Sequence, residues 1–280
     1  MRKDKIKKDK HRIKRRGLFY YLRIYGKILA QDLKSKMSYR ADFIISIIGM
    51  VFVNLSGFVS FWIIFKNFPT IMGWDYNEML FLYGFSLIAL TPMQCLFDNN
   101  WNLRTHVYNG DFIKYCFKPI NIFFYFMSEV FDIKGLGQLA FGITALVIAW
   151  KSLALPVSGL IIFKLVIGLI SASLFMCAVI NFSAAVCFFD KGGSGFIMVL
   201  AARFKDYARY PITIFRGAAR IIFTFVIPIA FMAYYPSLEF LSDKEPVFLT
   251  YFTPIYGVVF FYLSYKFWML GAKKYNGTGS

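Results

Sequence analysis

The residues with the clearest potential for chemistry are three charged ones in an otherwise apolar stretch. Glu129 and Asp132 are three positions apart, which would place both carboxylates on one face of a helix, and Lys134 follows them. Charges inside a membrane are costly and by default indicate function. The three residues are therefore a candidate intramembrane polar site, which in an enzyme would act on lipid. The simpler interpretation is an aromatic interfacial elbow over 121–131, with the true span beginning near Gly135.

The other reactive residues do not form a reaction centre. His11 lies in a basic tail and His106 in a polar segment, and neither has the spacing of a metal site. The cysteines show no CxxC spacing and have the pattern of ordinary buried thiols: Cys95, Cys116, Cys177 and Cys187. No GxxxxGK[ST] phosphate-binding loop occurs. We therefore expect no catalytic residue, no metal and no cofactor bound by this chain. Uphill transport would need energy from another protein.

One polar segment, residues 98–119, has the composition of a docking surface. Its aromatic residues alternate with charged ones, and the pair Asn109–Gly110 breaks the pattern. Aromatic side chains mixed with charge suit binding to a groove of another protein. An ordinary surface loop would have the same composition, and that alternative stays open.

Long apolar stretches must position all these residues. Hydrophobic residues make up 58% and aromatic residues 20% of the 280 positions, against about 45–50% apolar residues in soluble domains. A membrane span needs about 20 mostly apolar residues. Six stretches qualify: 41–65, 79–97, one within 121–150, 157–189, 221–235 and 248–269. The fifth contains Pro228, which predicts a kink. The prediction is an all-α polytopic membrane protein with six transmembrane helices.

The amino-terminal region divides into two parts. Residues 1–16 are strongly basic and too polar to fold alone, so we predict a disordered tail. Anionic lipid attracts such a tail by about 1 kcal/mol per cation, and we favour lipid contact, or a role only in setting the topology, over nucleic-acid binding. Residues 17–38 carry apolar side chains at three- and four-residue spacing, typical of an amphipathic helix lying in the membrane interface. Packing on a soluble partner would give the same pattern. Residues 39–280 are predicted to form one membrane domain.

The distribution of positive charge predicts the orientation. The chain has a net charge of +17, and its cations avoid alternate connections. One side receives the basic amino-terminal region, loops 98–119 and 190–220, and the carboxyl terminus, whereas the other receives only Lys66, Lys151 and Lys244. The positive-inside rule therefore places both termini in the cytoplasm of a multi-pass protein. No internal repeat is visible, which argues against many secondary transporters.

Short landmarks are spread along almost the whole chain after the basic tail. They are Tyr39-Arg40, Gly73-Trp74, Gly110-Asp111, Lys118-Pro119, Tyr210-Pro211, Pro228, Tyr235-Pro236, Trp268, Gly271 and the closing Tyr275, Gly277, Gly279 and Ser280. In their order and spacing the chain resembles the ABC transporter type-2 permeases, in the branch of six-span bacterial subunits of the cell membrane. The basic tail is longer than this family would lead us to expect.

The resemblance implies a set of partners. Two permease subunits, identical or paralogous, would pair along the first and fifth spans, and separate ABC ATPase subunits would bind ATP and Mg. Residues 17–36 would form the family's connecting helix, and 239–246 would lie at the outer gate. The segment after the second span would be the coupling helix that contacts the ATPase, which assigns that role to Asn109, Gly110, Asp111, Phe112 and Tyr115.

The combined prediction is the permease subunit of an ATP-driven exporter of a hydrophobic or amphipathic compound, such as a drug, a peptide antibiotic or a lipid-like molecule. The lipophilic or amphipathic cargo is inferred from aromatic residues expected in the interior: Phe52, Phe58, Phe61, Trp62, Phe223, Phe225 and Phe231. Two alternatives remain. One is a membrane-embedded enzyme that modifies lipid through Glu129 and Asp132. The other is a non-transporting immunity protein that only binds a toxin.

Overall fold

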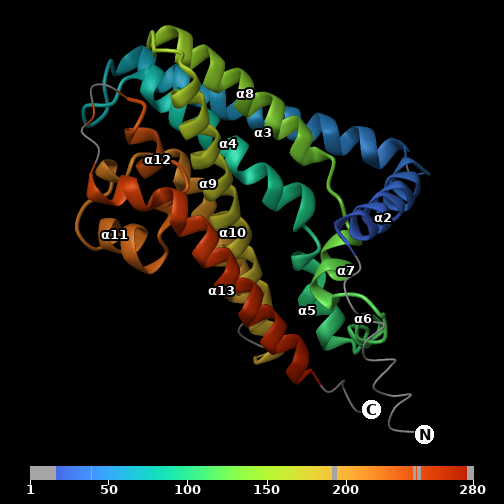
Figure 1. Cartoon of the computed structure of the whole chain (residues 1–280). Coiled ribbons are helices and arrows are strands. Elements are labelled where there is room, and N and C mark those ends of the chain that lie inside the picture. Colours follow the sequence, from blue (N-terminus) through green and yellow to red (C-terminus); the bar gives the residue numbers. More distant parts are fainter. Residues whose placement is uncertain (1–16, 39, 191–193, 242–243, 245–246, 276–280) are drawn as a thin grey trace, which may run out of the picture.

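The computed structural model describes residues 17–38, 40–190, 194–241, 244 and 247–275. Within these residues the chain forms helices and turns, and its only extended pairing is an isolated bridge between Ile71 and Trp74. The all-α prediction is therefore confirmed (Figure 1). The predicted basic tail, Tyr39, the end of the chain after Tyr275 and half of the expected gate segment lie outside the described residues.

Five helical stretches among the described residues are long and apolar enough to cross a membrane. They are α3 (Arg40–Asn67), α4 (Tyr76–Leu96) continued by α5 (Asn100–Tyr108), α8 (Lys134–Ser152), α9 (Gly159–Ala185) and α13 (Thr253–Lys274). This confirms a polytopic membrane fold. The third predicted span begins only at Lys134, after α7 (Ile122–Ser128) and a non-helical turn. That order matches the elbow interpretation of residues 121–131.

The fifth predicted span, 221–235, is not a continuous helix. It is divided into α11 (Ala218–Ile221), a π-helical turn η4 (Ile222–Val226), a 3₁₀ turn η5 (Ile229–Phe231) and α12 (Tyr234–Leu238). The break between η4 and η5 falls at Pro228, because proline lacks the amide hydrogen of a helical bond and its ring clashes with the preceding turn. The sequence predicted a kink here, and the structure has a full interruption.

The loop predicted over residues 190–220 runs along the bundle instead. It begins with α10 (Ser194–Phe204) beside α5, where the Arg104 side chain lies against Gly195. The next turn, η2 (Lys205–Arg209), packs against α4. The chain then reaches the 67–76 connection, where Trp74 Nε1 donates a hydrogen bond of 3.0 Å to Thr213 Oγ1. The segment therefore passes from one end of the bundle to the other, and its cations do not share one loop.

Helix α4 lies at the centre of the bundle, between α8 and α9 (Figure 1). A side chain on Gly84 would lie 2.6 Å from the Leu146 backbone nitrogen, so only glycine permits this approach of α4 to α8. Close contact through small residues is a usual way to pack helices in membranes. Helices α9 and α13 run parallel, and Gly257 N donates a hydrogen bond of 3.1 Å to Ser171 Oγ between them.

Both ends of the described chain lie at one end of the bundle, here called the docking end. The ring of Tyr21 in α2 (Leu18–Ser38) is 4.8 Å from that of Phe124 in α7, and the ring of Tyr275 is 5.2 Å from that of Phe112. Residues 67–76 and 152–158 form the opposite end. The predicted helix over 17–38 is present, and none of its side chains is fully buried. Its place on the membrane surface stays a prediction.

Candidate functional site

The segment after the second span forms two short helices joined by a tight turn. Helix α5 ends at Tyr108 and α6 (Ile113–Cys116) follows, with Gly110 between them at φ 85°. This left-handed backbone favours glycine, because a side chain would clash there. The Phe112 amide then donates a hydrogen bond of 3.0 Å to the His106 carbonyl and closes the turn. The predicted breaker at Asn109–Gly110 is thus the corner of a compact helical hairpin.

Phe112 anchors this hairpin to the bundle. Its side chain is fully buried, and its ring lies 5.0 Å from Phe188 at the end of α9 and 5.8 Å from Trp268 in α13. Ring pairs at such distances contribute about 0.5–1.5 kcal/mol each beyond burial. Phe112 therefore fixes the hairpin to two long helices, and a docked protein would not touch it.

Tyr115 is the second anchor, and it accounts for Glu129. The buried Tyr115 hydroxyl donates a hydrogen bond to the Glu129 carboxylate, and Lys114 Nζ lies 3.4 Å from the same group. Burial and this hydrogen bond raise the pKa of the Tyr115 hydroxyl, so that it stays protonated as the donor. Glu129 thus clamps the hairpin to the turn that precedes α8.

The exposed face of the hairpin consists of other residues. Tyr108 and Phe117 expose 66% and 79% of their surface, and Ile113 exposes 40%. Asn109 and Asp111 are exposed between them. Of the five predicted coupling residues, Asn109 and Asp111 can therefore meet a partner directly, Gly110 shapes the turn, and Phe112 and Tyr115 hold it from behind. We call Tyr108, Asn109, Asp111, Ile113 and Phe117 the docking face.

Buried amides tie α5 to its neighbours. Asn99 Nδ2 donates a hydrogen bond of 2.7 Å to the Phe126 carbonyl, and Asn100 Nδ2 donates one of 2.8 Å to Asn181 Oδ1 in α9. All three asparagines are buried. Buried polar groups cost free energy unless they are hydrogen-bonded, so these bonds fix the position of α5. The sequence did not single out these amides; only Asn181, a polar residue within the apolar stretch 157–189, carried a signal that could have indicated one.

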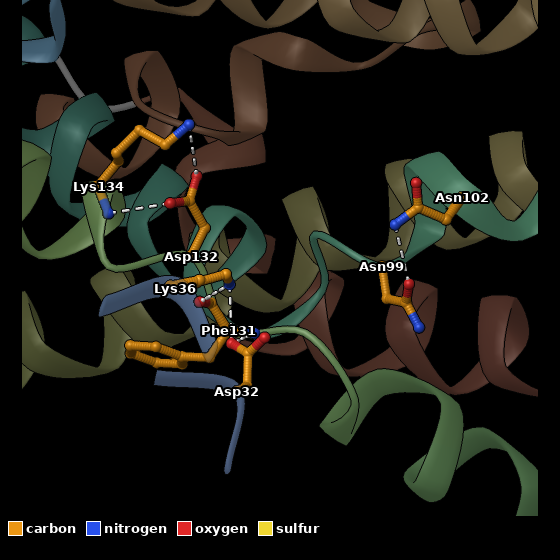
Figure 2. A network of polar contacts seen from close by, with 7 residues as sticks. All are labelled: Asp32, Lys36, Asn99, Asn102, Phe131, Asp132 and Lys134. Atoms are coloured by element: carbon orange, nitrogen blue, oxygen red, sulfur yellow. Dashed lines mark hydrogen bonds and ion pairs between the residues drawn. The ribbon is translucent and has the colours of Figure 1, made fainter. Parts of the chain in front are cut away.

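The predicted intramembrane site does not assemble as one cluster. Glu129 faces the hairpin, whereas Asp132 Oδ2 lies 3.8 Å from Lys134 Nζ on another side of the turn (Figure 2). Near this pair, Lys36 Nζ of α2 lies 2.7 Å from Asp32 and donates a hydrogen bond of 2.6 Å to the carbonyl of residue 131 (Figure 2). These contacts fasten α2 to the turn before α8.

Two adjoining cavities continue inward from this turn, each of about 320 Å³. The first lies between α2, α3 and the turn, and the second lies between α3, α4, α8 and η2. Ser46 and Lys134 line both. We call the two cavities together the polar groove, because much of their lining is polar or charged: Lys36, Asp42, Asp98, Asp132, Lys134, Asn54, Tyr83, Ser86, Gln94, Gln138, Lys205, Asp206 and Arg209.

The aromatic residues expected in the interior do not line this groove. Phe52, Trp62 and Phe225 expose 68%, 56% and 69% of their surface and point away from the bundle. Phe61, Phe223 and Phe231 are buried in helix packing. The lipophilic or amphipathic cargo inferred from these residues therefore stays a prediction.

The opposite end of the bundle contains an ion pair between the partly exposed Lys244 and the buried Glu78. Lys244 Nζ lies 3.0 Å from the Glu78 carboxylate, donates a hydrogen bond of 2.6 Å to the Gly73 carbonyl and lies 5.0 Å from the Trp74 ring centroid. Glu78 also accepts a hydrogen bond from the Asp75 amide as part of the cap of α4. Lys244 belongs to the predicted gate segment 239–246, and its contacts lie at this end of the bundle; the gate itself stays a prediction.

Comparison with known families gave one result that covers most of the chain. The family described as ABC-2 family transporter protein matches residues 44–279. Neither the curated proteins nor the solved structures compared with the chain gave a match.

Proposed function

The chain belongs to the ABC-2 family of transporter proteins, and from this premise we propose that it is the permease subunit of an exporter driven by a separate ABC ATPase. Its cargo would be a hydrophobic or amphipathic compound carried out of a bacterial cell. Membership of the family gives the chain a transport role as a membrane-embedded permease of an ABC transporter. The direction of transport, the cargo and the residues that contact the ATPase are parts of the proposal.

The docking face is the observation on which the proposal rests. It exposes Tyr108, Asp111 and Phe117 on a hairpin whose buried side holds Phe112 against α9 and α13. An ATPase can shift a permease between two states only if it binds them with different affinity. A protein bound to the docking face would move the ends of α9 and α13 together with the hairpin. We therefore place the docking end in the cytoplasm.

We propose that a second permease, a copy or a paralogue, pairs along α3. This helix is the least covered of the long helices, and Trp62 and Ile63 expose 56% and 50% of their surface. The aromatic side chains on its open face are large enough to form the centre of such an interface. The pass formed by α10 and η2, rather than residues 221–235, supplies the fifth span near this face. The remaining open surface of α3 contacts membrane lipid.

The test is to purify the chain together with the ATPase encoded beside it. We expect a stable complex whose ATP hydrolysis depends on the permease, and export of cargo into inside-out vesicles. Asp111→Arg reverses a charge on the docking face without disturbing the buried anchors, so it should weaken association and lower hydrolysis at least about tenfold if a charged contact is lost. Lys151→Glu, at the opposite end, is the matched control and should have no effect. Unchanged hydrolysis with Asp111→Arg would reject the docking face.

The lipid-modifying alternative loses the observation that motivated it. Its proposed residues, Glu129 and Asp132, do not meet: Glu129 bonds to Tyr115, and Asp132 lies beside Lys134. Turnover of a lipid by the isolated chain, abolished by Glu129→Gln, would restore it. Protection of cells without any ATPase would instead favour the immunity protein.

A further inference from the structure

One face of α3 lines the polar groove from the docking end to the middle of the helix. The lining residues Asp42, Ser46, Met50 and Asn54 recur every four positions, and so share a single helix face. Asn54 is about 21 Å along the helix from Arg40 at 1.5 Å per residue. The groove thus reaches from the interface region to the depth at which a membrane has no water.

Polar side chains are buried at this depth. Asn54, Tyr83 and Ser86 expose only 6%, 2% and 2% of their surface, and all three line the second cavity. Tyr83 donates a hydrogen bond of 3.2 Å to the Asn54 carbonyl, and Ser86 donates one of 2.8 Å to the Tyr83 carbonyl. Gln138 donates one of 3.0 Å to the Leu87 carbonyl. The cavity is therefore built from polar groups that an ordinary apolar contact between helices would not need.

The second cavity also carries an excess of positive charge. Lys134, Lys205 and Arg209 line it together with a single acid, Asp206. Lys134 is paired with Asp132, but no carboxylate of the described residues forms an ion pair with Lys205 or Arg209. Cations inside a membrane protein are expensive and usually pair with a charge or mark a pathway. Arg209 Nε donates a hydrogen bond of 2.9 Å to the Asp206 carbonyl, but neither cation has a carboxylate at ion-pair distance, so both can bind an anion from outside the described chain.

The first cavity has the opposite charge. Its lining contains Asp42, Asp98 and Asp132 against Lys36 and Lys134, and Lys36 is already held by Asp32. An anion is thus repelled at the entrance and attracted in the second cavity. Met50, Val53 and Leu90 supply apolar surface beside the cations, and Val53 is 71% exposed on the open side of α3. An apolar chain can reach the second cavity from the membrane without passing the acidic entrance.

We propose that the second cavity binds the anionic headgroup, a phosphate or a carboxylate, of an amphiphile whose apolar chain lies along α3. Lys205 and Arg209 hold the headgroup, because hydrogen bonds between charged groups are about twice as strong as neutral ones. Asn54 and Gln138 line the same site. If the site binds cargo, the proposal rests on the exporter function and narrows the cargo from hydrophobic or amphipathic compounds to amphiphilic anions. The binding of such an anion does not itself depend on the exporter function.

The test measures binding to the purified full-length permease in a neutral detergent, without any ATPase. The probes are dodecyl phosphate, dodecyltrimethylammonium and inorganic phosphate, titrated by calorimetry. We expect dodecyl phosphate to bind most tightly. The double variant Lys205→Gln/Arg209→Gln should weaken its binding at least about tenfold, because it removes both charge-assisted contacts with the headgroup. Arg203→Gln makes the same change on the exposed side of α10 and should bind as the unaltered chain does.

Two further measurements make the result decisive. Lys205→Arg keeps the charge and should keep binding, which separates loss of the cation from loss of the fold. Thermal unfolding of each variant verifies that the bundle is intact. Equal binding by the double variant and by Arg203→Gln would overturn the proposal, as would tighter binding of the cationic probe. Equal binding of inorganic phosphate would assign the site to a free ion rather than an amphiphile and would overturn it too. A chain that binds dodecyl phosphate but never stimulates an ATPase would refute the exporter function and leave the site standing.

Discussion

Replacing Phe112 by alanine tests how the hairpin is attached to the bundle. Phe112 is fully buried, and its ring contacts rings from α9, α13 and the end of the described chain. Removing a buried phenylalanine side chain costs about 3–5 kcal/mol through lost burial and the cavity left behind. For a chain of this size each kcal/mol lowers the unfolding midpoint by roughly 2 °C. We therefore expect Phe112→Ala to lower the midpoint by about 6 °C or more.

Phe117→Ala is a matched control in the same hairpin. Phe117 is 79% exposed, so the same change removes little buried surface and should shift the free energy of unfolding by less than about 0.5 kcal/mol. The assay is thermal unfolding of the purified permease followed by intrinsic fluorescence, since Trp268 lies 5.8 Å from Phe112 and reports on the site directly. ATP hydrolysis by the complex is measured in parallel.

The two variants should separate anchoring from docking. Phe112→Ala should lower both stability and coupling, because the hairpin would no longer move with α9 and α13. Phe117→Ala should lower only binding of the ATPase. Equal unfolding midpoints for the two variants would show that the buried aromatic contacts do not hold the hairpin and would refute the reasoning.

Two other changes probe the opposite end and the path of the chain. Lys244→Met leaves the buried Glu78 carboxylate unpaired and should cost about 3 kcal/mol of stability. The double variant Lys244→Met/Glu78→Gln should recover part of this loss. A double variant less stable than Lys244→Met would contradict the role of the ion pair. Single cysteines placed at Arg216 and at Lys151, in a chain otherwise free of cysteine, should react with an impermeant thiol reagent from the same side of the membrane. A cysteine at Tyr108 should react only from the other side. If Arg216→Cys and Tyr108→Cys react from the same side, residues 194–209 do not cross the membrane.

Hydropathy predicted the long helices, because a stretch of sufficient length and apolar composition is enough to indicate a membrane span. The stretch 41–65 became α3 (Arg40–Asn67), and the elbow before Lys134 was foreseen because charge and aromatic residues mark an interface. The sequence did not predict that residues 194–209 run along the bundle. The apolar part of this segment, α10, has only 11 residues, and the charged turn η2 that follows has the composition of a solvent-exposed loop. Charge is tolerated there because it lines a groove, which only the packing of three other helices creates.

The break at Asn109–Gly110 was predicted, because glycine is a local signal, and it forms the corner of the hairpin. The coupling role of this segment stays a prediction. Phe112 and Phe117 are the same residue type within one short segment, yet one is fully buried and the other 79% exposed. Composition does not distinguish them, since which side faces the bundle depends on the distant ends of α9 and α13. The buried pairing of Asn100 with Asn181 depends on the same long-range contacts.

The hydrogen bond from Trp74 to Thr213 connects the end of the bundle opposite the docking end with the segment that carries Arg209. Thr213 is only four residues from Arg209, and Trp74 lies under the Lys244 ammonium. If the proposed headgroup site draws Arg209 inward, it pulls on the segment that is hydrogen-bonded to Trp74. In the proposed exporter, binding of the cargo and opening of this end would then be mechanically coupled within one polypeptide.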